Sequence, residues 1–369
     1  MDDPAFRFCD DLGPKSVTYL YRPTIGLKGI VVVDNVAAGP SIGGVRIATD
    51  VSLEECFRLA RAMTFKNAAA GLPHGGGKSV IFADPSMDAA AKEQLVRAFA
   101  KSIESITDYI PGPDMGTNEE AMAWVKDEIG RCVGLPKELG GIPLDEIGAT
   151  ALGLVAAAET AGQKIKLSLN GARVAVQGFG AVGKHAARMF VDKGAVLVAA
   201  ADSSGTVVDA NGIDANALVA HKEQGLSIRD FPEGDKLERE AVVGVDCDIL
   251  IPAARPDAIR ADNQGTVQAK LIVQGANIGI TEEAEASLHG RGVLCVPDFI
   301  ANAGGVICAA VECRGGTQAE ALETIDESIR ANTAEVLEDA EREGLLPRQA
   351  ATTLAKNRVL KAMRLGRWD

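Results

Sequence analysis

Aromatic side chains are scarce in this sequence of 369 residues, at 4%, and histidine occurs only four times. Proteins that bind RNA or single-stranded nucleic acid stack the bases on aromatic side chains, so this class of function is disfavoured. None of the four histidines has the partner spacing of a zinc motif such as HExxH, and no metal site is expected. The seven cysteines form no CxxC pair and are expected to be reduced thiols that pack as small hydrophobes.

Long apolar runs and excess positive charge are missing as well. No run approaches the roughly 18 apolar residues that span a bilayer, and the acidic N-terminal segment does not resemble a secretory signal. The formal net charge of −13, from 38 basic and 51 acidic residues, disfavours nucleic acid and anionic membranes as partners. We therefore expect a cytoplasmic protein whose partner is a small molecule.

What is present is the composition of a folded globular protein, with 47% hydrophobic and 24% charged residues over a length that suits two domains. Strand-like and helix-like segments alternate, which predicts an α/β fold. In the N-terminal half we expect strands at 29–34, 44–48 and 78–82, helices at 53–70 and 88–107, and a turn-rich loop at 109–116. A βαβ series follows, with strands expected at 173–177, 196–201, 248–252, 270–273 and 293–296.

The predicted domain boundary lies near residue 148. Residues 1–147 would form the first domain and residues 148–330 the second. The end of the chain is typical of two charged amphipathic helices. We expect them to return to the first domain, which would then also include residues of about 331–369.

Residues 173–202 match a dinucleotide-binding fingerprint. A strand-like run leads into the loop Gly178, Phe179, Gly180, Ala181, Val182 and Gly183, and a helix-like segment and a second strand follow. Gly178 permits the tight turn, Gly180 lets a pyrophosphate approach the backbone, and Gly183 allows close packing of helix on strand. Asp202 follows Gly178 by 24 positions and is placed to accept hydrogen bonds from the adenosine ribose. That carboxylate favours NAD, although a hydroxyl such as that of Ser203 can bind the 2′-phosphate of NADP.

A second glycine-rich segment, residues 63–79, ends in Gly-Gly-Gly-Lys-Ser. A phosphate loop of the form GxxxxGK[ST] needs glycine where this sequence has Leu72, so that interpretation fails. Lys66 and Lys78 lie twelve positions apart and could converge on one pocket. Neighbouring ammonium groups disfavour each other's charge, so one of them could serve as a base at neutral pH. The alternative, that both are solvated surface lysines, is equally compatible with this segment.

Seven segments resemble, in order, the glutamate/leucine/phenylalanine/valine dehydrogenase family. They are residues 39–46, 63–78, 113–117, 148–150, 178–183, 275–277 and 302–306, and the resemblance covers nearly the whole chain. It implies reversible NAD(P)-dependent oxidative deamination of an L-amino acid to a 2-oxo acid and ammonia. It also implies a homo-oligomer, with an N-terminal α/β substrate domain and a C-terminal Rossmann dinucleotide-binding domain separated by a cleft.

The resemblance further implies roles for single residues in the first domain. Lys66, together with the backbone of Gly43 and Gly44, would hold the substrate α-carboxylate. Lys78 would be a lysine of low pKa that activates water, and Asp114 would carry protons to and from the amino nitrogen. This chemistry suits those residue types, because water attacks an iminium cation only with a neutral base to accept its proton.

On the cofactor side, the resemblance implies that Thr150 and Asn302 lie by the nicotinamide and the substrate amine. Asn277 would also lie on that side. Taken singly, each of the three could be an ordinary loop amide or helix cap.

The expected substrate is a branched-chain or other aliphatic L-amino acid. Glutamate-specific members of the family carry lysine where this sequence has Ile42, and serine at the position aligned with Ala309. The implied lining is apolar, from Ile42, Val306 and Ala309 with Gly112 nearby, and an unpaired glutamate carboxylate would be costly to bury there. Met63 also matches the leucine-type members.

Two alternatives remain open. Residues 72–73 and 111–117 resemble glutamate-type members, and residues 202–206 resemble some NADP-using glutamate enzymes, so glutamate or another polar amino acid is the second candidate substrate. A non-catalytic dinucleotide-binding sensor is the candidate from a different functional class.

Overall fold

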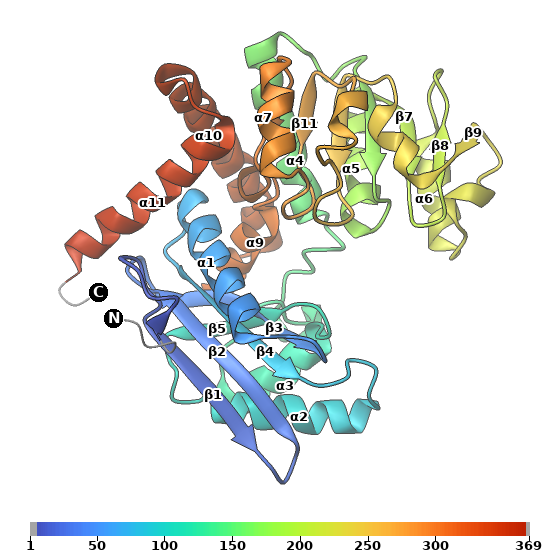
Figure 1. Cartoon of the computed structure of the whole chain (residues 1–369). Coiled ribbons are helices and arrows are strands. Elements are labelled where there is room, and N and C mark those ends of the chain that lie inside the picture. The colour runs from blue at the N-terminus through green and yellow to red at the C-terminus, as the bar shows by residue number, and fades with distance from the viewer. Residues whose placement is uncertain (1–5, 367–369) are drawn as a thin grey trace. The chain divides into compact units, whose positions relative to one another are not determined.

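The computed structural model describes residues 6–366, which divide into two compact units (Figure 1). The first unit comprises the chain up to Pro143, Val306–Ala321 and the chain from Thr352 onward. The second unit comprises Leu144–Gly305 and Leu322–Ala351. Among the described residues every helix is too short or too polar to span a bilayer, and the seven cysteines are free thiols.

This division differs from the predicted one in two places. The first break falls at residues 143 and 144 rather than near 148, and residues 331–351, predicted to return to the first domain, belong to the second unit. The cause is visible in the helix at 318–343, because Arg330 on it pairs with Glu159 and Glu341 on it pairs with Lys164, both within the second unit. Conversely, residues 306–321 join the first unit, although no signal in the sequence predicted it.

The first unit is built on a five-stranded sheet of order β1-β2-β4-β3-β5. The strands are β1 (Ser16–Arg22), β2 (Leu27–Asn35), β3 (Ser41–Ala48), β4 (Gly75–Phe82) and β5 (Tyr109–Pro113). Its helices are α1 (Leu53–Ala69), α2 (Ala89–Ser102) and α3 (Glu119–Ile129). Figure 1 shows α1 on one side of this sheet and α2 with α3 on the other.

Strand periodicity explains why both faces of the sheet are covered. Successive side chains of a strand point to opposite faces, so an unbroken apolar run such as that of β2 must be buried on both. Ile30 and Val32 of β2 pack with Cys56 and Ala60 of α1. Val31 and Val33 belong instead to the cluster formed with α2 and α3.

The predicted loop at 109–116 is wrong in its first half, which is strand β5. Proline and glycine in this segment indicate a turn locally. The segment is nevertheless a strand because it pairs in parallel with β3, Ile42 opposite Ile110 and Gly44 opposite Gly112. Tyr109 at its start is fully buried.

The second unit contains a seven-stranded sheet of order β12-β11-β10-β6-β7-β8-β9. The strands are β6 (Arg173–Gln177), β7 (Val196–Ala201), β8 (Thr206–Val208), β9 (Asp235–Leu237), β10 (Ile249–Pro252), β11 (Leu271–Val273) and β12 (Leu294–Val296). The five predicted strands are β6, β7, β10, β11 and β12, and they are parallel. The antiparallel strands β8 and β9 extend one edge. The predicted α/β class is confirmed in both units.

The remaining helices precede, alternate with or follow the strands of the second sheet along the chain. They are α4 (Ala149–Ile165), α5 (Ala181–Asp192), α6 (Ala215–Glu223), α7 (Glu282–Gly290), α8 (Asp298–Ala301), α9 (Gly304–Cys313), α10 (Gln318–Glu343) and α11 (Pro347–Leu365). The two predicted C-terminal helices are α10 and α11, seen in red in Figure 1.

Candidate active site

Two cationic side chains meet at one carboxylate in the first unit. Oδ2 of Asp114 lies 2.8 Å from Nζ of Lys78 and 2.9 Å from Nε of Arg46. Lys78 is buried, with 7% of its side chain exposed, and Asp114 retains 22%. The sequence predicted Lys78 and Asp114 as catalytic residues, and the structure brings these two together.

Arg46 was missed as a site residue. It lies on β3 two positions after Gly44, as the one charged residue of that strand, and it also pairs with Glu55. A charge in a strand that is buried on both sides rarely lacks a partner, so its position was the available signal.

The pairing of three strands places this cluster. Lys78 lies on β4, Arg46 lies on the adjacent parallel strand β3, and Asp114 follows directly on β5 at the other side of β3. Thr117 fixes the turn after β5, since its hydroxyl accepts a hydrogen bond from Asp114 N at 2.9 Å and donates to Val45 O at 2.8 Å. A side chain at Gly44 would lie 2.6 Å from Asp114 Cβ, so glycine is required there for Asp114 to approach.

Opposing effects set the pKa of Asp114. Burial raises it, but the ion pairs and hydrogen bonds with Lys78 and Arg46 lower it by more, and the pKa lies below its usual value. Asp114 is therefore a carboxylate at neutral pH. It can receive a proton directly from the ammonium group of Lys78, because the two groups are in hydrogen-bond contact.

The Gly-Gly-Gly run before Lys78 is part of strand β4 rather than a loop, so it does not form a phosphate-binding loop. Backbone atoms leave no room for a side chain at two of its glycines. A Cβ on Gly76 would lie 2.0 Å from Thr64 N in α1, and one on Gly75 would lie 1.7 Å from Asn35 O in β2. The run thus lets helix and strands approach closely beneath the site.

A small apolar cluster lies beside the glycine pair of β3. It consists of Ile42, Ile110, Val133 and Ala309, all buried in the first unit. Gly112 adjoins it, since a Cβ there would lie 3.1 Å from Val133 Cγ2. Three of the predicted substrate-lining residues, at 42, 112 and 309, are therefore neighbours in space.

Three other predicted substrate residues lie outside this apolar cluster. Lys66 and Met63 lie near the C-terminal end of α1 and are half-buried. Val306, in α9, is also half-buried.

The second unit carries the predicted dinucleotide loop between β6 and α5, with each glycine in a different role. Gly178 has φ +99°, and a Cβ there would lie 2.5 Å from that of Ala254. A Cβ on Gly183 would meet Gly178 O at 1.9 Å. Gly180 is different, because no atom of the described residues lies within 4 Å of the place its Cβ would take.

These features fit a dinucleotide. The open space at Gly180 lies at the N-terminus of α5, where no side chain caps the first N–H groups, and such a terminus favours phosphate. Within residues 6–366, the buried atoms Oε1 of Gln177 and Oδ1 of Asn302 have no hydrogen-bond partner. Buried acceptors of this kind usually have a partner, which a bound cofactor can supply.

Thr150, Asn277 and Asn302 gather near this loop. Thr150 lines a small pocket together with Ala181 and Val182 of α5. A Cβ on Gly275 would lie 3.2 Å from Val182 Cγ1, which places the 275–277 segment beside the same helix. Nδ2 of Asn302 donates to Oδ1 of Asn277 at 3.1 Å.

Asp202, predicted to accept hydrogen bonds from the adenosine ribose, is bonded by groups of the protein itself. Its carboxylate accepts hydrogen bonds from Lys222 Nζ at 2.6 Å, from Ile228 N at 3.1 Å, and from the backbone and hydroxyl of Ser204. Burial raises its pKa, but these hydrogen bonds lower it to about 2. Four donors use the acceptor capacity of a carboxylate, so Asp202 holds the 202–204 turn together, with exposed Ser203 at its centre.

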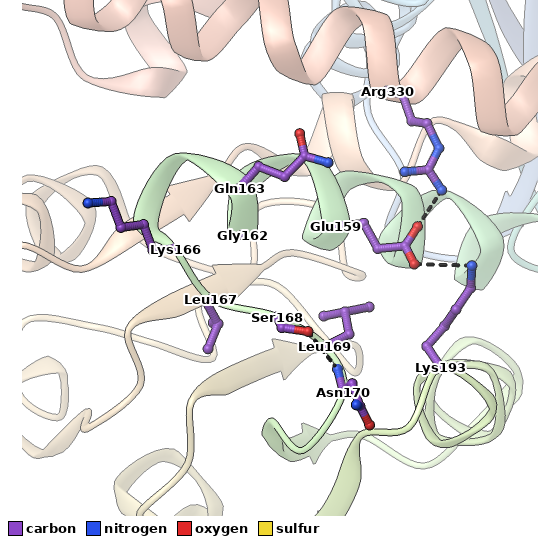
Figure 2. Close-up of a pocket in the computed structure, with 10 residues that line it drawn as sticks. All are labelled: Glu159, Gly162, Gln163, Lys166, Leu167, Ser168, Leu169, Asn170, Lys193 and Arg330. Carbon is purple, nitrogen blue, oxygen red and sulfur yellow. Dashed lines mark hydrogen bonds and ion pairs between the residues drawn. The ribbon is translucent and has the colours of Figure 1, made fainter.

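A different pocket of about 620 Å³ in the second unit contains none of the predicted site residues (Figure 2). It is lined by the C-terminal half of α4, the 166–170 connection, Lys193 and Arg330. Figure 2 shows the carboxylate of Glu159 between Arg330 and Lys193, with which it pairs. These ion pairs join α4, α10 and the end of α5, which accounts for the charged lining without a ligand.

Comparison with known proteins agrees with this geometry. The sequence pattern of the family described as "Glutamate/Leucine/Phenylalanine/Valine dehydrogenase" matches residues 140–366. The pattern "Glu/Leu/Phe/Val dehydrogenase, dimerisation domain" matches residues 21–131.

Individual proteins are similar over most of their length. Glutamate dehydrogenase of Aeropyrum pernix is 36% identical over 90% of this chain and 85% of its own. NADP(+)-dependent glutamate dehydrogenase of Pyrobaculum calidifontis is 35% identical over 92% and 87%. The hetero-hexameric glutamate dehydrogenase of Thermus thermophilus, crystallised with leucine bound, has a TM-score of 0.86 at 33% identity, covering 96% of this chain and 91% of the other.

Proposed function

Because the chain belongs to the glutamate/leucine/phenylalanine/valine dehydrogenase family, it is an NAD(P)-dependent amino-acid dehydrogenase, and we propose that it catalyses the reversible oxidative deamination of L-glutamate. The observation that carries the reaction is the cluster of buried Lys78 with half-buried Asp114 and Arg46. The choice of glutamate rests on the relatives, which are glutamate dehydrogenases by name. They favour the alternative substrate over the aliphatic one that the sequence led us to expect first.

In the proposed mechanism the substrate is held through its α-carboxylate by Lys66 and the backbone N–H groups of Gly43 and Gly44. Removal of hydride from Cα leaves an iminium, which water attacks. Lys78 would accept the proton of that water, after passing its own proton to Asp114 across their 2.8 Å contact. Asp114 would then deliver a proton to the amino nitrogen as ammonia leaves.

The residues that would hold the cofactor come from the second unit. The loop 178–183 and the N-terminus of α5 would bind the pyrophosphate, and Gly180 leaves room for it. Thr150, Asn277 and Asn302 would bind the nicotinamide end. When bound, the nicotinamide supplies the hydride acceptor.

A specific observation favours a second candidate substrate, an aliphatic L-amino acid. The cluster of Ile42, Ile110, Val133 and Ala309 adjoins Gly43 and Gly44, so a substrate held there would place its side chain near apolar groups. A glutamate carboxylate left unpaired in such surroundings would be disfavoured by several kcal/mol.

Initial rates of reductive amination separate these candidates. We would measure kcat/KM with ammonia and either 2-oxoglutarate or 4-methyl-2-oxopentanoate, using NADH and NADPH in turn. A higher kcat/KM for 2-oxoglutarate is expected, and a higher value for the aliphatic 2-oxo acid would establish the second candidate instead. Cofactor binding without turnover of any 2-oxo acid would indicate a sensor and contradict the proposed function.

A variant at the apolar cluster sharpens the comparison. Ile42→Lys places an ammonium where glutamate-specific family members have one, and it should shift the ratio of the two kcat/KM values towards 2-oxoglutarate. Ile42→Leu keeps the position apolar and serves as the matched control. If both variants left the ratio unchanged, Ile42 would not contact the substrate.

We also propose that the chain accepts NADP as well as NAD, in contrast to the earlier preference for NAD. The charge of Asp202 is compensated by Lys222, and Arg229 lies beside the 202–204 turn, donating to Ser204 O at 3.5 Å. A 2′-phosphate would therefore meet cations as well as the carboxylate. Comparable kcat/KM values for NADH and NADPH would support this, and a hundredfold preference for NADH would contradict it.

The assembly is proposed to be a homo-oligomer. The first unit contains the match to a dimerisation domain, and the Thermus relative is hexameric by name. Analytical ultracentrifugation should give a mass that is a multiple of 38.4 kDa, and a monomer at micromolar concentration would contradict the proposal.

A further inference from the structure

A half-buried arginine in the second unit has no role in the proposed function. Arg348 lies in the first turn of α11, and Nη1 donates to Oδ1 of Asp298 at 2.8 Å. Its Nε pairs with Glu285, and Nη2 contacts Oε1 of Gln274 at 3.3 Å. The two carboxylate side chains are 7% and 2% exposed, so this is a desolvated cluster of charges rather than a surface ion pair.

The second carboxylate oxygen of Asp298 binds the backbone of Ile278. Oδ2 accepts a hydrogen bond from Ile278 N at 2.9 Å. Ile278 has φ +52°, a conformation that is strained for a β-branched residue and persists only when its surroundings hold it. The carbonyl of Ile278 is also held, because it accepts from Asp257 N at 2.8 Å.

Both ends of the asparagine pair contact Asp298, one through its side chain and the other through its backbone carbonyl. Asn277 immediately precedes Ile278, so the backbone that Asp298 holds determines where its side chain points. Asn302, the partner of Asn277, donates its own N–H to Asp298 O at 2.8 Å. The side chain of Asp298 therefore fixes the backbone from which Asn277 projects, whereas Asn302 is held by the backbone carbonyl of Asp298, in a helical hydrogen bond of α8.

The place of this pair in the sheet is where a ligand is expected. Asn277 follows the carboxyl end of β11, and Asn302 follows the carboxyl end of the adjacent parallel strand β12. Ligands of doubly wound sheets bind outside the carboxyl ends of the strands. Oδ1 of Asn302, buried and without a partner in the described part of the chain, is an acceptor available to such a ligand.

We propose that Arg348 is a positioning residue for the nicotinamide end of the cofactor, acting through Asp298 on the Asn277–Asn302 pair. The proposal rests on the proposed function in assigning that pair to the nicotinamide. The shape of arginine explains why this residue is used: its planar fork bonds Asp298 and Glu285 at once, each in a fixed direction. Lysine could neutralise one carboxylate but could not fix the direction of both.

The test compares a complete cofactor with a fragment that lacks the nicotinamide. Dissociation constants of NADH and ADP-ribose, and of NADPH and 2′-phospho-ADP-ribose, are measured for the full-length protein and its Arg348→Lys variant. We expect the variant to bind the complete cofactors at least tenfold more weakly, and the fragments within twofold of the original. A general loss of structure would weaken fragment and cofactor alike.

Two further variants keep the test decisive. Asp298→Asn, which keeps the shape of the side chain but not its charge, should reproduce the effect of Arg348→Lys. Glu285→Gln removes the carboxylate that does not contact Ile278, so it should leave the ratio of cofactor to fragment affinity within twofold. Equal effects on cofactor and fragment in Arg348→Lys, or no effect on either, would overturn the proposal.

The outcome is distinguishable from failure of the proposed function, because neither measurement requires turnover. If the protein deaminated no amino acid but Arg348→Lys still separated cofactor from fragment, the positioning role would stand and the substrate assignment would fall. If turnover were normal but Arg348→Lys weakened cofactor and fragment by the same factor, the proposed function would stand and the positioning role would fall.

Discussion

At the scale of single residues, Asp114 is held as a carboxylate by two cations rather than one. Removing Arg46 takes away one of them and should raise the pKa of Asp114 towards its usual value. In Arg46→Met we therefore expect the acidic limb of the kcat/KM profile to move to higher pH. A full pH–rate profile of reductive amination measures this.

A matched control for that profile is Arg97→Met. Arg97 also pairs with carboxylates in the first unit, but it lies on α2, away from the strands that carry Asp114. Its profile should coincide with that of the unchanged protein. An acidic limb that stayed in place in Arg46→Met would mean that Asp114 does not determine it.

Asp202 allows a separate prediction, because its pKa of about 2 lies below the value of 3.8 expected for the unfolded chain. Its contacts stabilise the fold fully above about pH 4, and the contribution is lost as the pH falls towards 2. Asp202→Ala should lower the free energy of unfolding at pH 7 by roughly 2 kcal/mol, measured by chemical denaturation.

Asp202→Ala also tests whether Asp202 binds the adenosine ribose of the cofactor. If the carboxylate holds its own turn, as the four hydrogen bonds indicate, the affinities for NADH and NADPH should change by similar factors. A selective loss of NADH affinity with unchanged stability would instead support the predicted ribose contact.

Single residues also show where sequence reasoning reaches its limit. Lys78 and Asp114 could be predicted because family motifs contain them, and the structure joins them. Arg46 stands in one of those motifs but was given no role, since its contact with Asp114 spans 68 positions along the chain. The internal contacts of Asp202 were hidden for the same reason, because Lys222 and Ile228 lie 20 and 26 positions away.

At the scale of elements, the loop between β6 and α5 uses its glycines for two different purposes. Gly183 has no room for a side chain, whereas Gly180 has open space. Gly183→Ala should therefore lower both the melting temperature and the affinity for NADH. Gly180→Ala should keep the melting temperature and lose affinity alone, because the added methyl group would occupy the space proposed for the pyrophosphate. Thermal denaturation and fluorescence titration with NADH measure the two quantities.

Either of two results would contradict this division of roles. One is a loss of stability in Gly180→Ala as large as that in Gly183→Ala. The other is NADH affinity that stays unchanged in Gly180→Ala.

Elements were predicted well where hydrophobic pattern and length agree, as in the five parallel strands of the second sheet. They were missed where local signals oppose the tertiary structure. Strand β5 contains two prolines and a glycine, and it is a strand only because β3 pairs with it. Strands β8 and β9 have three residues each, as β11 and β12 do, but they include the polar residues Thr206, Asp235 and Lys236, so no apolar run marks them.

At the scale of the whole molecule, the chain leaves the first unit and returns to it twice. The return of residues 306–321 was not predicted. They include most of α9, an apolar helix that could pack equally well in the core of either unit. Its last turn shows what holds it: Glu312 accepts hydrogen bonds from Leu135 N at 3.1 Å and from Ile142 N at 2.9 Å, both within the first unit. Such contacts between distant segments leave no local pattern in the sequence.

The chain returns to the first unit for the second time through α11. Arg358 Nη1 donates to Ala68 O at 3.2 Å and to Ala69 O at 2.8 Å, at the C-terminal end of α1, where backbone carbonyls lack helical partners. A cation there is favoured by the helix dipole as well. Arg358→Met should destabilise the first unit by about 2 kcal/mol, whereas exposed Lys356→Met on the same helix should have little effect.

Hydrogen exchange resolves that loss by region, which matters because a chain of two units need not unfold in a single step. In Arg358→Met, exchange should accelerate in α1 and in residues 352–366, which belong to the first unit. Strands β6 and β7 of the second unit should keep their protection. Uniform acceleration throughout both units would mean that α11 stabilises the molecule as a whole, and unchanged exchange in α1 would mean that Arg358 does not anchor it.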